Sequence, residues 1–168
     1  RVYNNRGVDE LVFLDIFATE QKRKINMKLV ADVIKECFMP VAIGGGIDSI
    51  QDINNLLKIG ADKVVIKTKA LTDKNFIKEA IAFFGSQCIS ISIDAYKTTE
   101  GYKVHNKLDL DIKLSQFINE MKDCEVGEFL INSVDNDGML NGFDINLINL
   151  VEAMTNIPIV AVGGGGHL

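Results

Sequence analysis

Short β-rich runs alternate with longer amphipathic runs along the whole chain, and this alternation limits the fold more than any other feature. Compact runs of branched apolar residues predict strands at residues 10–16, 40–43, 63–68, 88–94, 128–133 and 158–162. Apolar positions at helical spacing predict helices near residues 26–37, 50–59, 73–83, 109–122 and 145–154, with a hairpin at 96–105. Strict alternation of this kind predicts a parallel sheet covered by helices.

A repeat within the chain separates the two parallel folds that fit this order. Glu10 and Glu128 open two strands, Pro40 and Pro158 open two others, and the members of each pair are separated by the same number of residues. Each proline leads through an apolar run into consecutive glycines. The repeat indicates an internal duplication of about four βα units, and two such halves make a closed barrel of about 250 residues. A doubly wound sheet is the alternative.

The sequence therefore predicts an α/β fold of the (β/α)8 TIM barrel class, present as a fragment. Residues 1–168 are expected to form a single partial (β/α)8 barrel domain that covers about strands 2 to 7. The first strand, the eighth strand and the last helices are expected to lie outside this sequence.

The fourth predicted strand has two faces of different character. Its apolar set is Ile89, Ile91 and Ile93, and the set expected to face a narrow barrel interior is Cys88, Ser90, Ser92 and Asp94. Asp94 ends the inward set at the carboxyl end of the strand, where barrel enzymes place their active sites. Asp94 is therefore a candidate acid or base catalyst, and Asp137, in the turn after the next strand, is the second. Capping or shaping a turn is the alternative role of both.

Two glycine turns follow strands that the internal repeat relates to each other. One turn contains Gly45 and Gly46, and the equivalent turn contains Gly164 and Gly165. Glycines let backbone N–H groups approach a ligand closely and bind phosphate without a basic domain, although turns also need glycine for conformational reasons. The symmetric placement predicts a substrate with a phosphate at each end. Lys67, Thr68 and Gly138 also lie at strand ends on this side.

Three charged residues open strands at the opposite, N-terminal end of the predicted barrel. They are Glu10, Lys63 and Glu128. Charged residues at first strand positions are commonly solvated or paired with each other. The alternative is a charged ring at the bottom mouth of the barrel, which gates a passage or meets a partner.

The composition indicates which classes of partner and which cellular compartment are expected for this protein. A net charge of −5 argues against non-specific nucleic-acid binding, which needs a basic surface. No apolar run is long enough to cross a membrane, and no signal peptide is visible. The cysteines are widely spaced in apolar surroundings and form no metal-binding pair: Cys37, Cys88 and Cys124. A cytoplasmic protein without a bound metal is expected.

Eight segments spread over nearly the whole chain carry a family resemblance. They are Asp-Glu-Leu-Val-Phe-Leu-Asp-Ile from Asp9, Pro-Val-Ala-Ile-Gly-Gly-Gly-Ile from Pro40, Gly-Ala-Asp-Lys-Val from Gly60, Phe-Gly-Ser-Gln-Cys from Phe84, Ile-Asp-Ala from Ile93, Gly-Glu-Phe-Leu-Ile-Asn-Ser from Gly127, Asp-Asn-Asp-Gly from Asp135, and residues 158–166. Together these segments resemble the cyclase subunit of imidazole glycerol phosphate synthase, the HisF family. The Phe-Leu-Asp-Ile and Phe-Gly-Ser-Gln pieces favour this family over its isomerase sister in histidine biosynthesis.

The resemblance implies a heterodimer with a glutaminase subunit that docks on the N-terminal face and delivers ammonia through the barrel. The ammonia would meet a bis-phosphate ribulosyl-formimino ribotide at the C-terminal face. Cleavage and ring closure would then yield imidazole glycerol phosphate and aminoimidazole carboxamide ribotide, with no cofactor.

The resemblance also implies roles for individual residues. Asp94 matches one of the two catalytic aspartates of the family, and Asp137 matches a further active-site aspartate. The other catalytic aspartate and an active-site lysine match positions on or just after the first strand, outside this sequence. Phosphate-turn positions match Gly46, Thr68, Gly138, Gly164 and Gly165. Three of the four charged residues around the ammonia entrance match Glu10, Lys63 and Glu128.

Departures from the family pattern leave the substrate open. Asparagine is replaced by Lys67, arginine and threonine by Asn136 and Met139, serine by Val162, and threonine by Phe17. These changes remove hydrogen-bond donors near the expected phosphates, although the lysine restores a charge. A second function is therefore considered, in which a HisF-like paralogue of surface-polysaccharide clusters amidates a sugar; the run 36–40 resembles those paralogues. A non-catalytic barrel that serves as a partner scaffold is the third.

Overall fold

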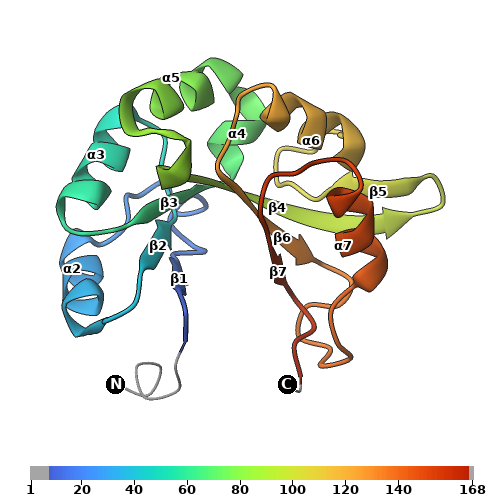
Figure 1. Cartoon of the computed structure of the whole chain (residues 1–168), viewed down its shortest axis with the longest axis horizontal. Coiled ribbons are helices and arrows are strands. Elements are labelled where there is room, and N and C mark those ends of the chain that lie inside the picture. The colour runs from blue at the N-terminus through green and yellow to red at the C-terminus, as the bar shows by residue number, and fades with distance from the viewer. Residues whose placement is uncertain (1–7, 167–168) are drawn as a thin grey trace. The chain divides into compact units, whose positions relative to one another are not determined.

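The computed structural model describes residues 8–166, which divide into two compact units, one up to Ile89 and the other from Ser90 on. The strands and helices of both units are labelled in Figure 1. Each unit contains parallel strands that are connected through helices.

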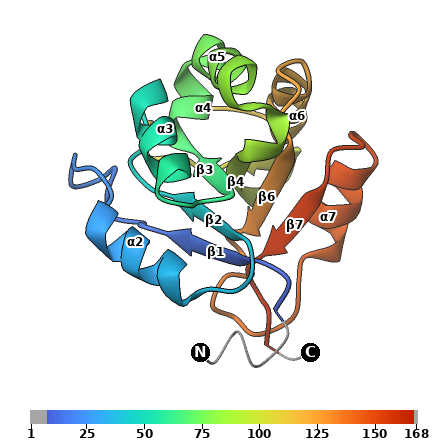
Figure 2. The ribbon, with the colours of Figure 1, turned by 60° about the vertical axis from the view of Figure 1, so that its left-hand side comes forward.

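In the first unit, three short strands form a parallel sheet. β1 (Leu11–Leu14) pairs with β2 (Val41–Gly44), and β2 pairs with β3 (Lys63–Ile66). The helical elements of this unit are α2 (Met27–Glu36), α3 (Ile50–Lys58), α4 (Thr68–Thr72), α5 (Lys74–Phe84) and the 3-10 turn η1 (Ser86–Cys88). Figure 2 shows α2 alongside β1 and β2.

Local side-chain caps begin the first two of these helices. Asn26 accepts hydrogen bonds from the backbone N–H groups of Lys28 and Leu29 at the start of α2. Ser49 and Asp52 form a capping box at the start of α3, in which each side chain binds the other residue's backbone N–H. Such caps satisfy N–H groups that have no partner within the helix. The two helices therefore begin where their sequences carry the signal.

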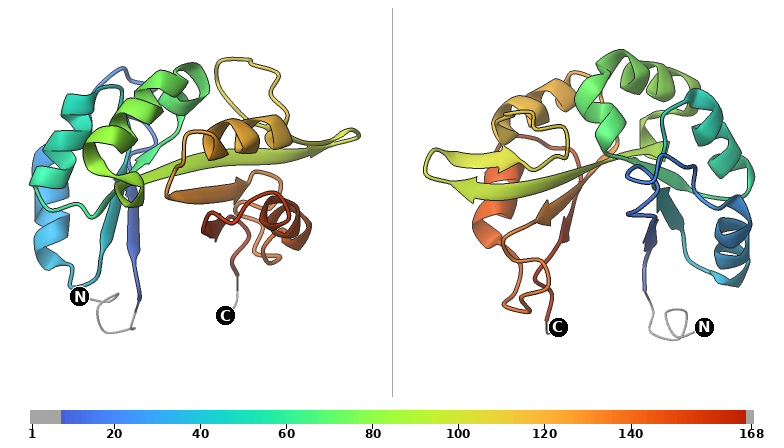
Figure 3. Two further views of the ribbon diagram at one scale, coloured as in Figure 1. Left: turned by 45° about the horizontal axis from the view of Figure 1, so that its top comes forward. Right: turned by 180° about the vertical axis from the view of Figure 1, so that it is seen from behind.

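In the second unit, parallel strands are combined with a hairpin. β4 (Ile89–Thr98) pairs in parallel with β6 (Glu128–Ser133), and β6 pairs in parallel with β7 (Ile159–Val162). β5 (Gly101–Val104) returns antiparallel to the second half of β4. The helices are α6 (Leu114–Lys122) and α7 (Ile145–Glu152). Figure 3 shows the β4–β5 hairpin extending outward with α6 beside it.

The register between β4 and β6 confirms the two faces predicted for the fourth strand. Ile91 pairs with Phe129 and Ile93 with Ile131, and all four side chains are at most 1% exposed. Burial of such side chains stabilises a fold by roughly 1.5–3 kcal/mol each. Ser90, Ser92 and Asp94 alternate with them and share the opposite face.

Several element boundaries differ from the sequence prediction; β1 is shorter, at Leu11–Leu14, and β4 extends to Thr98. Cys88 belongs to the 3-10 turn η1 and not to the inward set of β4. The strand predicted at 63–68 ends at Ile66, because the chain turns at Lys67 into the short helix α4. The helix predicted at 109–122 begins only at Leu114. Asp109 adopts a left-handed backbone with φ 55°, which no α-helix accommodates.

The order of strands and helices confirms the α/β class and is that of a partial (β/α)8 barrel. The prediction of one domain over residues 1–168 stays a prediction. Among residues 8–166, none of the helices has the length and apolar character needed to span a membrane.

A phenol–carboxylate contact ties the hairpin to α7 in the second unit. The Tyr102 hydroxyl of β5 donates to the Asp144 carboxylate, with oxygen–oxygen distances of 3.1 and 3.0 Å. Asp144 also accepts from the Leu147 N–H and so caps α7. Burial and the neighbouring Asp144 carboxylate raise the pKa of Tyr102 to about 12.

We expect Tyr102 to ionise near pH 12 in the folded protein. Because its folded pKa lies above the ordinary value of 10.0, its stabilising contribution is complete below pH 10 and is lost as the pH rises toward 12. A spectrophotometric phenolate titration should therefore show a step near pH 12 that is missing in Tyr102→Phe. In Asp144→Asn, which keeps a helix-capping side chain, the step should move to lower pH. If the step does not move in Asp144→Asn, the pKa of Tyr102 does not depend on the Asp144 carboxylate.

Candidate functional site

The polar face of β4 and β6 carries the best-defined group of candidate residues in the second unit. Asp94 is half-buried near the carboxyl end of the parallel pairing and lies opposite Asn132. The Asn132 amide Nδ2 donates to Asp94 Oδ1 over 3.3 Å. Toward the other end of the same face, the Ser90 hydroxyl donates to Glu128 Oε1 over 2.7 Å. One face thus holds two predicted site residues, Asp94 and Glu128, each in contact with a polar neighbour.

Sequence reasoning missed Asn132 as a site residue. The alternation of side chains along a strand could have found it. Asn132 follows Glu128 by an even number of positions in the same strand, so the two side chains share one face.

The turn after β6 places Asp135 and Asp137 differently. Asp135 Oδ2 accepts the backbone N–H of Lys97 over 2.7 Å and so holds the turn against β4. The backbone N–H of Asp137 donates to the Ser133 carbonyl, while the residue itself is exposed. Gly138 follows with φ +74°, and a Cβ there would meet nothing within 4 Å. Asp137 is therefore open to solvent on a turn that Asp135 anchors.

The glycine turn after β7 packs closely on the turn after β6. A Cβ on Gly164 would lie 2.1 Å from the Gly142 carbonyl oxygen, and one on Gly166 would lie 2.5 Å from that of Leu140. The Gly142 N–H donates to the Gly164 carbonyl over 2.8 Å. Gly165 is packed more loosely, since a Cβ there would lie 3.6 Å from its nearest contact, the ring of Phe143. Packing therefore already requires glycine at Gly164, whatever binds to the turn.

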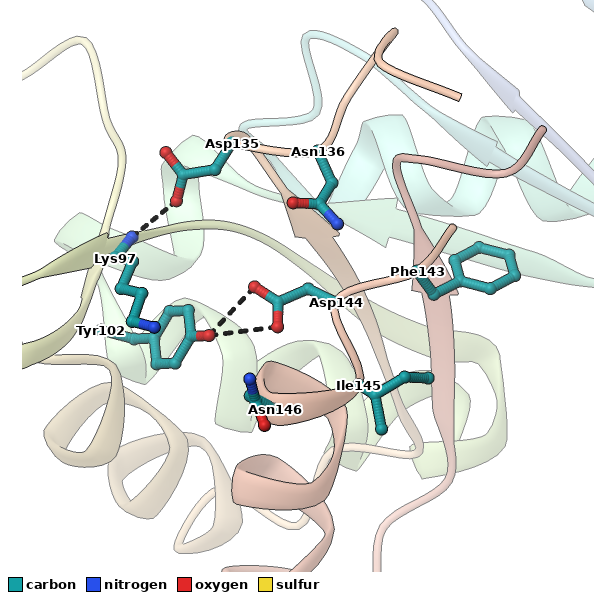
Figure 4. Close-up of a pocket in the computed structure, with 8 residues that line it drawn as sticks. All are labelled: Lys97, Tyr102, Asp135, Asn136, Phe143, Asp144, Ile145 and Asn146. Atoms are coloured by element: carbon teal, nitrogen blue, oxygen red, sulfur yellow. Dashed lines mark hydrogen bonds between the residues drawn. The ribbon is translucent and has the colours of Figure 1, made fainter. Parts of the chain in front are cut away.

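A hollow of about 490 Å³ lies beside the turn after β6, between the hairpin and the start of α7. Figure 4 shows Lys97, Tyr102, Asp135 and Asp144 among its lining residues. The Tyr102 hydroxyl and the Lys97 N–H both point at carboxylates within the hollow. These bonds join the hairpin to the turn after β6 and give the hollow a structural role.

In the first unit, a loop closed by an ion pair surrounds the glycine turn after β2. Arg23 donates to both carboxylate oxygens of Asp15, with N–O distances of 2.6 and 3.0 Å. Asp15 also accepts the backbone N–H groups of Phe17 and Ala18. The Arg23 hydrogen bonds are the largest influence on the pKa of Asp15 and lower it below its ordinary value. Asp15 is thus an ionised anchor that holds the loop closed.

The glycines of this turn fit tightly against that loop. A Cβ on Gly45 would lie 2.7 Å from the Asp15 carbonyl oxygen, and one on Gly46 would lie 2.7 Å from that of Arg23. Both glycines also have positive φ, at +127° and +63°. The turn is therefore a close approach of two backbones, and packing alone requires glycine at both positions.

The next strand end contains Lys67 and Thr68. Lys67 is exposed, and Thr68 is the first residue of the short helix α4. Lys67 places no side-chain cap on that helix. The two residues lie at the carboxyl end of β3, as the sequence predicts.

At the other end of the same unit, Glu10 and Lys63 form an ion pair. Lys63 Nζ lies 2.8 Å from Glu10 Oε2, and the two side chains are 27% (Glu10) and 23% (Lys63) exposed. Glu128, the third residue of the predicted ring, belongs to the second unit. Glu10 and Lys63 are thus paired with each other, and Glu128 accepts the Ser90 hydroxyl in its own unit. Within residues 8–166, no group of three His, Cys, Asp or Glu residues could hold a metal ion.

Comparison with known proteins identifies the family of this chain. The sequence model of the histidine biosynthesis protein family matches residues 1–168. A HisF subunit of imidazole glycerol phosphate synthase from Clostridium botulinum is 42% identical over 171 residues, which cover 99% of this chain and 68% of that protein. The chain belongs to the HisF family.

Other relatives agree with this placement. A protein of Vibrio vulnificus named as subunit hisF2 of imidazole glycerol phosphate synthase is 44% identical over 166 residues, covering 97% of this chain and 61% of that protein. A HisF subunit of Streptococcus mutans is 40% identical over 172 residues, covering 100% of this chain and 68% of that protein. This HisF-family chain thus spans 61% to 68% of the length of these curated relatives.

We expect Gly164→Ala to destabilise the protein more than Gly138→Ala. Both glycines have positive φ, so both variants carry the cost of a left-handed alanine, about 1–2 kcal/mol. Only the Gly164 variant also forces a Cβ against a backbone carbonyl, which adds roughly 1–3 kcal/mol of overpacking. Urea unfolding of the full-length protein measures both losses, and equal losses would show that the contact between the two turns is absent in solution.

Proposed function

We propose that the protein of which this chain is part is the cyclase subunit of an imidazole glycerol phosphate synthase. It would use ammonia from a glutaminase subunit to convert a bis-phosphate ribulosyl-formimino ribotide into imidazole glycerol phosphate and aminoimidazole carboxamide ribotide. The identity of 40% to 42% with two HisF subunits over 99% or more of this chain supports the proposal.

The observation that carries the proposal is the position of Asp94. Its carboxylate lies on the polar face of β4, near the carboxyl end of the parallel pairing with β6. Active sites of (β/α)8 enzymes are built at these strand ends. A carboxylate on the inward face at this end is in the position from which it can exchange protons with a bound substrate.

The proposed reaction needs such proton exchange at several steps. Condensation of ammonia with a carbonyl group requires the nitrogen to lose protons and the oxygen to leave as water. Ring closure and cleavage of the formimino C–N bond also move protons between nitrogen atoms. Asp94 is proposed as the acid and base for these transfers, and the exposed Asp137 as a second group that exchanges protons with solvent.

Phosphate recognition is assigned to the turns at the strand ends. Gly45, Gly46, Lys67 and Thr68 are proposed to bind phosphate in the first unit, and Gly138, Gly164 and Gly165 in the second. Tight packing against Asp15 and Arg23 supports a rigid turn in the first unit. A rigid turn holds N–H groups in place before the anion arrives, so little ordering is required on binding. The exposed Lys67 adds a positive charge.

Ammonia entry and partner docking are assigned to the opposite strand ends. Glu10 and Lys63 would line the entrance in the first unit, and Glu128 in the second. The Glu10–Lys63 ion pair supports this, because a paired arrangement keeps two charges at a passage without leaving either unbalanced. The glutaminase subunit would cover this face in a heterodimer.

Amidation of a sugar is the alternative acceptor chemistry. Met139 is 59% exposed and Val162 is 37% exposed, and both are apolar where the HisF pattern has hydroxyl groups. An apolar surface beside the glycine turn suits an acceptor with fewer phosphate oxygens to bind at that place. A scaffold without catalysis is the third possibility, which the experiment below also tests.

We expect Asp94→Asn in the full-length protein to lower the rate of ammonia-dependent ribotide consumption by about 100-fold or more, because general acid–base catalysis contributes about that much. Asp111→Asn is the matched control, since Asp111 lies in the same unit, is 77% exposed and pairs only at the surface with Lys103. The control should retain the wild-type rate. A near-normal rate in Asp94→Asn would remove Asp94 from the mechanism, and no turnover by the wild type would leave the histidine-pathway assignment without support.

A further inference from the structure

Asn132 stands between Asp94 and the glycine turn after β7 in the second unit. We propose that Asn132 is a positioning residue, which fixes the orientation of the Asp94 carboxylate through a hydrogen bond from its NH2 group. The carbonyl end of the same amide is confined by the backbone of Gly163. The inference rests on the proposed catalytic role of Asp94, and it assigns a role to a side chain that neither the motifs nor the glycine pattern selected.

The contact with Asp94 determines which way the Asn132 amide points. An ionised carboxylate only accepts hydrogen bonds, so the amide atom that faces it must be the NH2 group. The bond from Nδ2 to Asp94 Oδ1 measures 3.3 Å, which is long for N–H···O. Hydrogen bonds of catalytic groups are often long in the absence of substrate and tighten when it binds.

The other end of the amide is confined by the backbone of the glycine turn. Asn132 Oδ1 is fully buried and has no hydrogen-bond partner among the described residues. A Cβ on Gly163 would lie only 2.7 Å from this oxygen and 2.8 Å from the Ser133 carbonyl oxygen. Gly163, with φ +85°, therefore provides the space in which the amide fits and leaves it little room to rotate.

A buried acceptor without a donor is unfavourable for folding, and native proteins contain few of them. An apolar side chain of similar shape would avoid this cost at the same position. The amide is thus better explained by what its NH2 group does to Asp94 than by any contribution of its carbonyl to stability. This is the reason to assign it to the orientation of the carboxylate.

The test compares kinetics and stability in Asn132→Leu, which has nearly the same shape and no polar atoms. We expect kcat for the ribotide with ammonia to fall by about 10- to 100-fold, as misplacement of a catalytic group by about 1 Å does. The KM for the ribotide should stay within about twofold, because Asp94 and not a binding contact is disturbed. The urea midpoint should be unchanged or higher, since an unsatisfied oxygen is removed.

Two further variants sharpen the comparison. Asn132→Asp has the same shape but replaces the donor with a second carboxylate oxygen, so its kcat should fall at least as far. Asn119→Leu is the control, because Asn119 is exposed on α6 of the same unit, and it should leave kcat unchanged. If kcat per folded molecule stays within about twofold of the wild type in Asn132→Leu, the positioning role is overturned.

A measurement that needs no turnover separates this inference from the proposed function. In full-length protein labelled with 15N at asparagine, the side-chain NH2 protons of Asn132 should exchange slowly with solvent. In Asp94→Ala the exchange should accelerate by about tenfold or more, because the acceptor is gone. Unchanged exchange would contradict the Asn132–Asp94 contact even in an active enzyme. A protected amide in a protein without ammonia-dependent turnover would refute the proposed function and leave the contact standing.

Discussion

The parallel register between β4 and β6 is the constraint on which the candidate site depends. It places Asp94 opposite Asn132 and Ser90 opposite Glu128, so that polar side chains share one face of the strands. The isoleucines and Phe129 that alternate with them are buried on the other face. A shift by one residue would exchange the faces and bury the carboxylates among apolar side chains. The apolar packing therefore determines where the polar chemistry is presented.

The glycine turns have two roles that the structure helps to separate. Gly45, Gly46 and Gly164 each face a backbone carbonyl at a distance that excludes any Cβ. Glycine at these positions is needed for packing, so their presence alone is weak evidence for a bound phosphate. Gly138 and Gly165 have room for a side chain. The case for phosphate at the turns therefore depends on the HisF family match and on the rigidity that the packing confers.

Much of the fold was predictable because its signals are local. The isoleucines of β4 determine its two faces, and the Ser49–Asp52 capping box determines where α3 begins. The predicted boundaries that differ from the structure involve backbone conformations that are not evident from residue type. At Asp109, for example, the left-handed φ is incompatible with a helix, and α6 begins only at Leu114. Of the candidate site, Asp94 was found from its parity and its position at a strand end. The Asn132 contact was not found, because it depends on register between strands distant in sequence.

The measurement that tests the account most directly follows the nitrogen atom. Full-length protein is incubated with 15N-ammonium and the bis-phosphate ribotide, and in parallel with its glutaminase subunit and amide-15N glutamine, and the products are examined by mass spectrometry. A cyclase that uses ammonia in this way places one 15N atom in imidazole glycerol phosphate in both reactions and none in the aminoimidazole carboxamide ribotide. If a nucleotide sugar is supplied as competitor and the label appears only in its amidated product, the result would contradict this function and select the alternative acceptor.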